Sequence, residues 1–185
     1  MDPAAEDSCR LEWGDRVYFS HLTVRMAGVA TLFSPNLWPK VLGVAEAVPG
    51  HLLHLRVCME GLVVNFINIY APTSSPERLH FYQQASAFLG TLDHLECLVL
   101  GRDFTTTHKK WDQAVPGCHG RPPGVVEHHS LVDIWRDHHQ DNISMFTFVR
   151  VEAHQLHHSR LDHIYLSPFH LSRGPLLQHP AGPVL

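Results

Sequence analysis

The chain has no long hydrophobic run, and this absence excludes several classes of protein. No apolar stretch reaches the roughly 20 residues that a membrane-spanning helix needs, and no basic-then-apolar signal pattern opens the N-terminus. The four cysteines are widely spaced and form no C-x-x-C pair, unlike a secreted disulfide framework. We therefore expect a soluble intracellular protein, nuclear or cytoplasmic, without a membrane partner.

The chain also lacks an excess of positive charge. Its formal net charge is −4, although 17 histidines make that charge strongly dependent on pH. Proteins that hold DNA non-specifically usually carry a basic excess, because contacts to phosphate supply most of the affinity. Any contact with nucleic acid must therefore come from a local site.

Repeats, low-complexity tracts and clear linkers are missing as well. Hydrophobic residues make up 44% of the 185, enough for one domain with a core. We expect this domain to span residues 13–172. Residues 1–12 and 173–185 are polar or rich in Pro and Gly, so we expect irregular tails there.

Strands predominate in the hydrophobic pattern. The alternating segment His51–Met59 and the β-branched segment Leu62–Tyr70 flank Glu60-Gly61, which predicts a hairpin. A polar loop is expected over Gly101–Gly124. The further expected strands are Arg16–Ser20, Gly28–Phe33, Val41–Val48, Glu96–Leu100, Met145–Val151 and Leu161–Leu166.

Two helices are expected among these strands. Ser75 is a suitable N-cap, followed by Pro76 and by Glu77 in the first turn, and apolar residues then recur at helical spacing up to Gly90. A second helix is suggested by four apolar residues, Leu131, Val132, Ile134 and Trp135. The mixture indicates an α/β or α+β fold.

Three sequence fragments carry the chemistry. They are N-I-Y-A-P, which contains Tyr70, then L-V-L-G-R-D-F-T, which contains Asp103, and S-R-L-D-H-I-Y, which contains Asp162. Carboxylates at the ends of buried strands can hold a hard cation or orient a water toward phosphorus. Each fragment alone is more often a turn or a cap.

Together, in this order, the fragments resemble the endonuclease/exonuclease/phosphatase superfamily, and most of all the endonuclease domain of non-long-terminal-repeat retrotransposon polyproteins. The resemblance implies a four-layer sandwich of two mixed β-sheets with flanking helices. It implies a DNA partner and Mg²⁺ or Mn²⁺ as cofactor. It also implies that Tyr70 lies against the scissile phosphate, that Asp103 positions the attacking water, and that Asp162 orients a catalytic histidine.

The chain departs from the family pattern at several points. Thr105 replaces the asparagine of G-D-F-N, and Arg102 replaces its glycine, which would place a side chain in a tight turn. No counterpart of the metal-binding glutamate or of the final S-D-H is found. We therefore expect a sandwich that is incomplete at both ends and a defective catalyst. The alternatives are a non-catalytic fragment that binds nucleic acid or protein, or a relic without function.

Other candidate sites have a simpler interpretation. His163 follows Asp162 on a strand, so it should point to the opposite face and not replace the catalytic histidine. His94 and Cys97 have zinc-like spacing, but no second pair follows. Scattered cations could form a basic strip for nucleic acid, although such residues on a sheet surface are usually solvated. These cations are Lys109, Lys110, Arg150, Arg160 and Arg173.

Overall fold

The structure is a computed structural model that describes residues 3–23, 26–37, 39–103, 125–140, 146–152 and 155–168. Its elements in chain order are α1 Pro3–Trp13, η1 Gly14–Arg16, β1 Val17–Thr23, β2 Met26–Leu32, β3 Lys40–Val48, β4 Leu52–Met59, β5 Leu62–Tyr70, α2 Ser75–Leu89, β6 Cys97–Asp103, α3 Val125–His128, β7 Val132–Asp133, α4 Ile134–His138, β8 Phe148–Glu152, β9 Gln155–Ser159 and β10 Asp162–Leu166. No helix in this part of the chain is long and apolar enough to cross a membrane.

A six-stranded mixed sheet forms the centre of the fold, in the order β3-β4-β5-β6-β10-β7. The predicted β4–β5 hairpin is confirmed, and Met59 pairs with Leu62. Glu60 and Gly61 both have positive φ, +51° and +83°, as a two-residue turn of type I′ requires. β5 and β6 are parallel, whereas the other neighbours are antiparallel.

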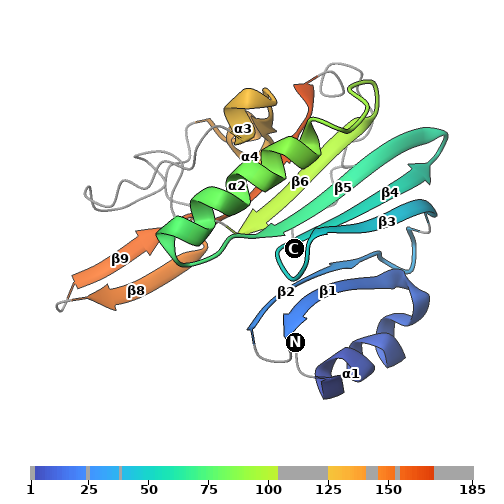
Figure 1. Cartoon of the computed structure of the whole chain (residues 1–185). Coiled ribbons are helices and arrows are strands. Elements are labelled where there is room, and N and C mark those ends of the chain that lie inside the picture. The colour runs from blue at the N-terminus through green and yellow to red at the C-terminus, as the bar shows by residue number, and fades with distance from the viewer. Residues whose placement is uncertain are drawn as a thin grey trace, which may run out of the picture.

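Helix α2 connects β5 to β6 and covers one face of the sheet (Figure 1). Its apolar side chains, among them Phe81 and Leu89, pack on Ile67 and Leu100 of the sheet. The predicted helix is confirmed, but its start is shifted by one residue. Ser74 is the N-cap and Ser75 the first helical residue, which places Pro76 still within the first turn.

The β1–β2 hairpin packs on the other face of the sheet. Val29 and Phe33 lie in a core with Leu53, Leu55 and four further buried side chains of this cluster. The hairpin is tied to the turn between β3 and β4, because the Gly50 N–H donates to Ser20 Oγ at 2.7 Å. Mixed α/β architecture is thus confirmed, while the expected second mixed sheet is a two-stranded antiparallel pair among the described residues.

The N-terminal segment differs from the expected irregular tail. Residues of α1 form a helix that lies beside β1 (Figure 1). Glu6 explains why, because it pairs with Arg10 one turn later and with His21 Nε2 of β1 at 2.8 Å. This contact joins segments far apart in sequence, so local helical pattern alone did not reveal it.

Two further expectations needed correction. The predicted helix around Leu131–Trp135 is a short strand, β7, followed by the short helix α4, because Val132 pairs with Leu166 of β10. The predicted strand Met145–Val151 is β8. It pairs with β9, a strand that was not predicted because histidines interrupt its apolar pattern. The β8–β9 pair projects beyond the sheet (Figure 1). Residues 104–124 and 169–185, which include most of the expected loop and the C-terminal tail, lie outside the described residues.

Candidate active-site cleft

The structure brings the three predicted site positions into one row across three neighbouring strands. Tyr70 of β5 pairs in register with Asp103 of β6, and Asp103 pairs with Asp162 of β10. β5 and β6 are parallel and both end at this edge, where antiparallel β10 begins. The topology of the sheet therefore gathers residues that are distant in sequence. Thr105 lies outside the described residues.

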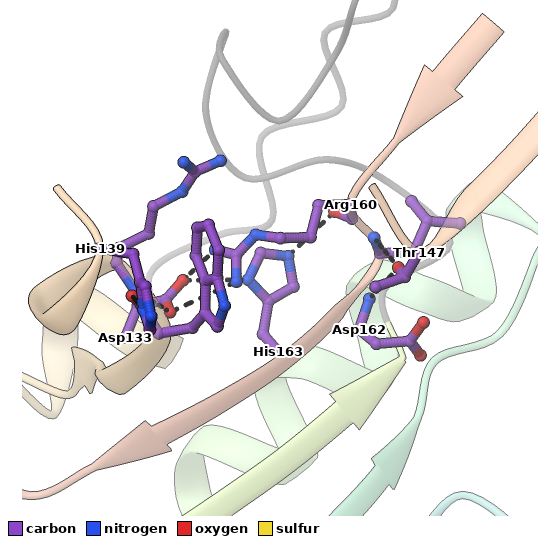
Figure 2. A network of polar contacts seen from close by, with 9 residues as sticks. Asp133, His139, Thr147, Arg160, Asp162 and His163 are labelled. Atoms are coloured by element: carbon purple, nitrogen blue, oxygen red, sulfur yellow. Dashed lines mark hydrogen bonds and ion pairs between the residues drawn. The ribbon is translucent and has the colours of Figure 1, made fainter. Parts of the chain in front are cut away.

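Asp162 is exposed at this edge and its backbone is fixed. Thr147 Oγ1 accepts the N–H groups of Leu161 at 3.0 Å and of Asp162 at 3.1 Å. Figure 2 shows Thr147 beside the backbone of Asp162, while the Asp162 carboxylate points away from His163. The carboxylate is thus held at the rim and remains available to solvent or to a ligand.

Tyr70 is half-buried at the same edge. Its ring is nearly parallel to that of His51, with ring centroids 6.0 Å apart. The Tyr70 carbonyl oxygen lies 2.6 Å from His51 Nδ1, and since a carbonyl can only accept, Nδ1 carries the proton. The histidine thereby fixes the end of β5.

A cleft of about 690 Å³ opens along this edge. Tyr70 and Asp162 both line it, between the β1–β2 hairpin on one side and α4 on the other. Small, apolar and aromatic residues also line the cleft, namely Gly28, Ala30, Gly101, Ile134, Trp135, His138, His139 and Ile164. The site is therefore a concave surface of the size of small-ligand pockets.

A buried polar network forms the wall behind Asp162, and sequence reasoning had not singled it out. Asp133 accepts an ion-pair hydrogen bond from Arg160, whose side chain is 4% exposed, and a second bond from His163 Nδ1 at 3.2 Å (Figure 2). Its Oδ1 also caps α4 by accepting the Arg136 N–H at 3.2 Å. An aspartate directly before a short helix signals such a cap, but the partners of Asp133 come from a distant segment.

The charges of this network hold Asp133 ionised. Burial alone would raise the pKa of Asp133, but hydrogen bonds from His163 and Arg160 and the backbone N–H of Arg136 hold that pKa well below its usual range. The Arg160 guanidinium also lies 5.5 Å from the centre of the Trp135 ring. The network thus locks α4 to the start of β10.

His163 and Arg160 clarify two of the predictions. The His163 ring is buried and contacts Asp133, and its Nε2 lies 3.1 Å from the Arg160 carbonyl oxygen. This placement is consistent with the prediction that His163 does not replace a catalytic histidine beside Asp162. The expectation that Arg160 is solvated was wrong, because the ion pair with Asp133 compensates its burial. Of the other proposed basic residues, Lys109, Lys110 and Arg173 lie outside the described residues.

Arg102 is also placed differently from the expectation of a tight turn. It lies within β6, 4% exposed, and its guanidinium sits over the rings of Tyr82 and Tyr165. Burial lowers the pKa of Arg102 to about 9, and the nearby charge of Glu127 partly opposes the shift. The guanidinium therefore packs against Tyr82 and Tyr165, while Arg102 is also among the residues that line the cleft.

The described side chains provide only part of a site for Mg²⁺ or Mn²⁺. Within the described ranges, no group of three or more His, Cys, Asp or Glu side chains is arranged to hold a metal ion. Asp162 lines the cleft and Asp103 is its register neighbour. One or two carboxylates fit a Mg²⁺ ion that keeps several waters and shares a substrate phosphate, but they do not form a closed cage.

Comparison with known sequences gives one long match. The chain is 42% identical over 176 residues to the uncharacterized 149 kDa protein of transposon TX1 from Xenopus laevis. The match covers 93% of this chain but only 13% of that protein, so the chain spans about an eighth of the relative's length. No protein-family model matches the chain.

Solved structures identify the architecture. The endonuclease domain of TRAS1, a telomere-specific non-LTR retrotransposon, matches with a TM-score of 0.63 over 91% of this chain and 79% of its own, at 12% identity. This chain has the endonuclease/exonuclease/phosphatase fold. An AP endonuclease from Archaeoglobus fulgidus shares the fold at 21% identity, with a TM-score of 0.60 over 82% of this chain and 66% of that one. TDP2 from D. rerio, complexed with a single-strand DNA product, matches at 11% identity and a TM-score of 0.60 over 90% and 68%. The predicted resemblance is therefore confirmed at the level of the fold.

Proposed function

We propose that this endonuclease/exonuclease/phosphatase-fold domain binds DNA in the cleft beside Tyr70 and Asp162 and hydrolyses phosphodiesters there with impaired turnover. The observation that carries the proposal is the row of Tyr70, Asp103 and Asp162 across β5, β6 and β10. A cleft opens at this row. The fold neighbours include endonucleases and a DNA complex, which supports the same substrate class.

The proposed roles follow from the positions of the three residues. Tyr70 lies where its ring can contact a phosphate in the cleft, and Asp103 orients the attacking water. Asp162, exposed at the rim, would hold a metal ion together with Asp103 and the substrate phosphate. When bound, Mg²⁺ or Mn²⁺ would neutralise negative charge on the phosphate.

Impaired turnover is proposed because of one replacement two residues after Asp103 in the sequence. Thr105 stands where the family that the sequence resembles has an asparagine. A threonine hydroxyl offers one hydrogen-bond donor, whereas the asparagine amide offers two. An enzyme that loses one pre-positioned hydrogen-bond donor to the negative charge of the transition state typically becomes slower by about 10²–10³-fold. A weak nuclease is therefore expected, and a DNA-binding domain without turnover is the second candidate.

Nicking of supercoiled plasmid by the purified chain in Mg²⁺ or Mn²⁺ tests this proposal. Activity should disappear with EDTA, with Asp103→Ala and with Asp162→Ala. It should persist with Asp7→Ala, which removes an exposed carboxylate on α1 that does not line the cleft. Thr105→Asn should raise the rate by up to about 10²-fold. A folded chain that binds labelled DNA without nicking it would favour the second candidate, and one that neither nicks nor binds would refute both.

A further inference from the structure

The α4 wall of the cleft ends in a pair of stacked rings. His139 follows α4 directly, and its ring lies nearly parallel to the Trp135 ring, with ring centroids 4.8 Å apart and an angle of 14° between the planes. Both residues line the cleft. Trp135 is half-buried, whereas His139 is exposed. The ring that this stack presents to a ligand is therefore the imidazole of His139.

Contacts within the protein hold this stack in place. The Arg160 guanidinium lies over the Trp135 ring, 5.5 Å from its centre, and is itself fixed by the ion pair with Asp133 (Figure 2). The His139 Nδ1 atom lies 3.0 Å from the Trp135 carbonyl oxygen, and since a carbonyl can only accept, Nδ1 donates. The same carbonyl accepts the His139 N–H at 3.0 Å. The imidazole is thus oriented before a ligand binds, which lowers the entropic cost of stacking on it.

The rest of the cleft leaves room for a flat ligand beside the catalytic row. Across from α4, the β1–β2 hairpin contributes the small residues Gly28 and Ala30. Asp162 and Ile164 of β10 lie on the same face two residues apart, and both line the cleft. Ile164 is 50% exposed and offers apolar surface next to the carboxylate. The volume of about 690 Å³ is in the range of pockets that hold one small molecule, the size class of a nucleotide.

We propose that His139 is a stacking platform for one unpaired base of a DNA strand whose phosphate lies at the row of Tyr70, Asp103 and Asp162. The inference rests on the proposed function and deepens it, because it names the form of DNA that the cleft takes. A base within a duplex has both faces covered by its neighbours, so only a base outside the stack can lie on His139. The preferred substrate is therefore DNA with an unpaired base next to the scissile phosphate.

The charge of the chain favours stacking as the source of this affinity. The formal net charge is −4, so general attraction to phosphate is weak and a local contact must supply the binding. Stacking on an aromatic side chain needs only a flat ring, and each of the four bases has such a face. The platform should therefore distinguish unpaired from paired DNA and show little preference among the bases.

Binding of three short fluorescein-labelled duplexes to the full chain tests the inference. One duplex is fully paired, one contains a single unpaired adenosine, and in the third the unpaired nucleotide lacks its base. Their phosphorothioate linkages resist hydrolysis, so Mg²⁺ can be present. The unmodified chain should bind the unpaired adenosine about tenfold more tightly than either other duplex, as stacking of one base on one aromatic side chain predicts. Fluorescence anisotropy measures the three dissociation constants.

Substitutions of His139 separate stacking from charge and from structure. His139→Ala should abolish the preference, whereas His139→Phe, which keeps a flat ring and carries no charge, should retain it. The matched control is His80→Ala, because His80 is an exposed histidine of α2 that does not line the cleft. Affinity for the fully paired duplex should be unchanged in every variant, since a paired base does not reach the ring. Urea unfolding checks that each variant keeps the fold.

The possible outcomes distinguish this inference from the proposed function. Equal binding of the three duplexes by the unmodified chain would overturn the inference alone. It is also overturned if His139→Ala keeps the preference or if His139→Phe loses it. A chain that binds none of the duplexes would refute the inference and the proposed function together, whereas a clear preference without plasmid nicking would support the inference and a binding domain without turnover.

Discussion

Asp133 and Arg160 form an ion pair that joins the end of β7 to the residues just before β10. Both side chains are largely removed from solvent, at 14% and 4% exposure. Asp133→Ala would leave the Arg160 charge buried without this carboxylate, and we expect the free energy of unfolding to fall by about 3–5 kcal/mol. Urea unfolding followed by circular dichroism measures the change.

A double variant separates the loss of the pair from the loss of packing. Asp133→Ala combined with Arg160→Met removes both charges and leaves a long apolar side chain in the same space. Most of the stability lost in the single variant should return, because no uncompensated buried charge remains. If the double variant were as unstable as Asp133→Ala, the buried charge would not be the cause.

Acid should weaken the fold through Asp133. Its pKa is lowered in the folded state, so its stabilising contribution is present above the unfolded pKa of about 4 and is lost as the pH falls toward the folded value. The free energy of unfolding should therefore decrease below about pH 4. In Asp133→Asn, urea midpoints measured across this range should decline less steeply than in the unmodified chain.

His54 should make stability depend on pH in a higher range. Burial lowers the pKa of His54, and the Arg56 charge adds to this, against a hydrogen bond with Asn65 and the charge of Glu96. Stability is then fully present above the unfolded pKa of about 6.5 and decreases as the pH falls toward the lowered folded value. Thermal unfolding of His54→Gln should show a smaller decrease below about pH 6.5 than the unmodified chain.

Gly50 is required at the junction of the β1–β2 hairpin with the sheet. Its φ is +71°, and an added Cβ would lie 2.6 Å from the Leu22 backbone nitrogen. Gly50→Ala should reduce the free energy of unfolding by at least about 1–3 kcal/mol, the usual range for a non-glycine residue in strained backbone. Gly43→Ala is the matched control, because no atom lies within 4 Å of its Cβ position. Equal urea midpoints for the two variants would contradict this account.

The local elements were predictable because their signals are local. The β4–β5 hairpin follows from alternation and from Glu60-Gly61, and α2 follows from Pro76 and helical spacing. The positions of Tyr70 and Asp162 at one cleft were also expected, although only as an implication of motif resemblance. These predictions needed no knowledge of contacts between distant segments.

The remaining features depend on such contacts. α1 is anchored by the pairing of Glu6 with His21, and β7 exists because Val132 pairs with Leu166. The role of Asp133 requires Arg160, which the sequence alone suggested to be solvated. Sequence patterns report the periodicity of one element, whereas these interactions are defined only when two elements meet.

The row of Tyr70, Asp103 and Asp162 has a consequence for the order of folding. Its members belong to segments far apart along the chain, and their alignment requires both the β5–β6 crossover and the return of β10. Closing such long loops is slow compared with forming the adjacent β4–β5 hairpin. The cleft should therefore be among the last parts of the domain to form during refolding, and ligand binding there would report that folding is complete.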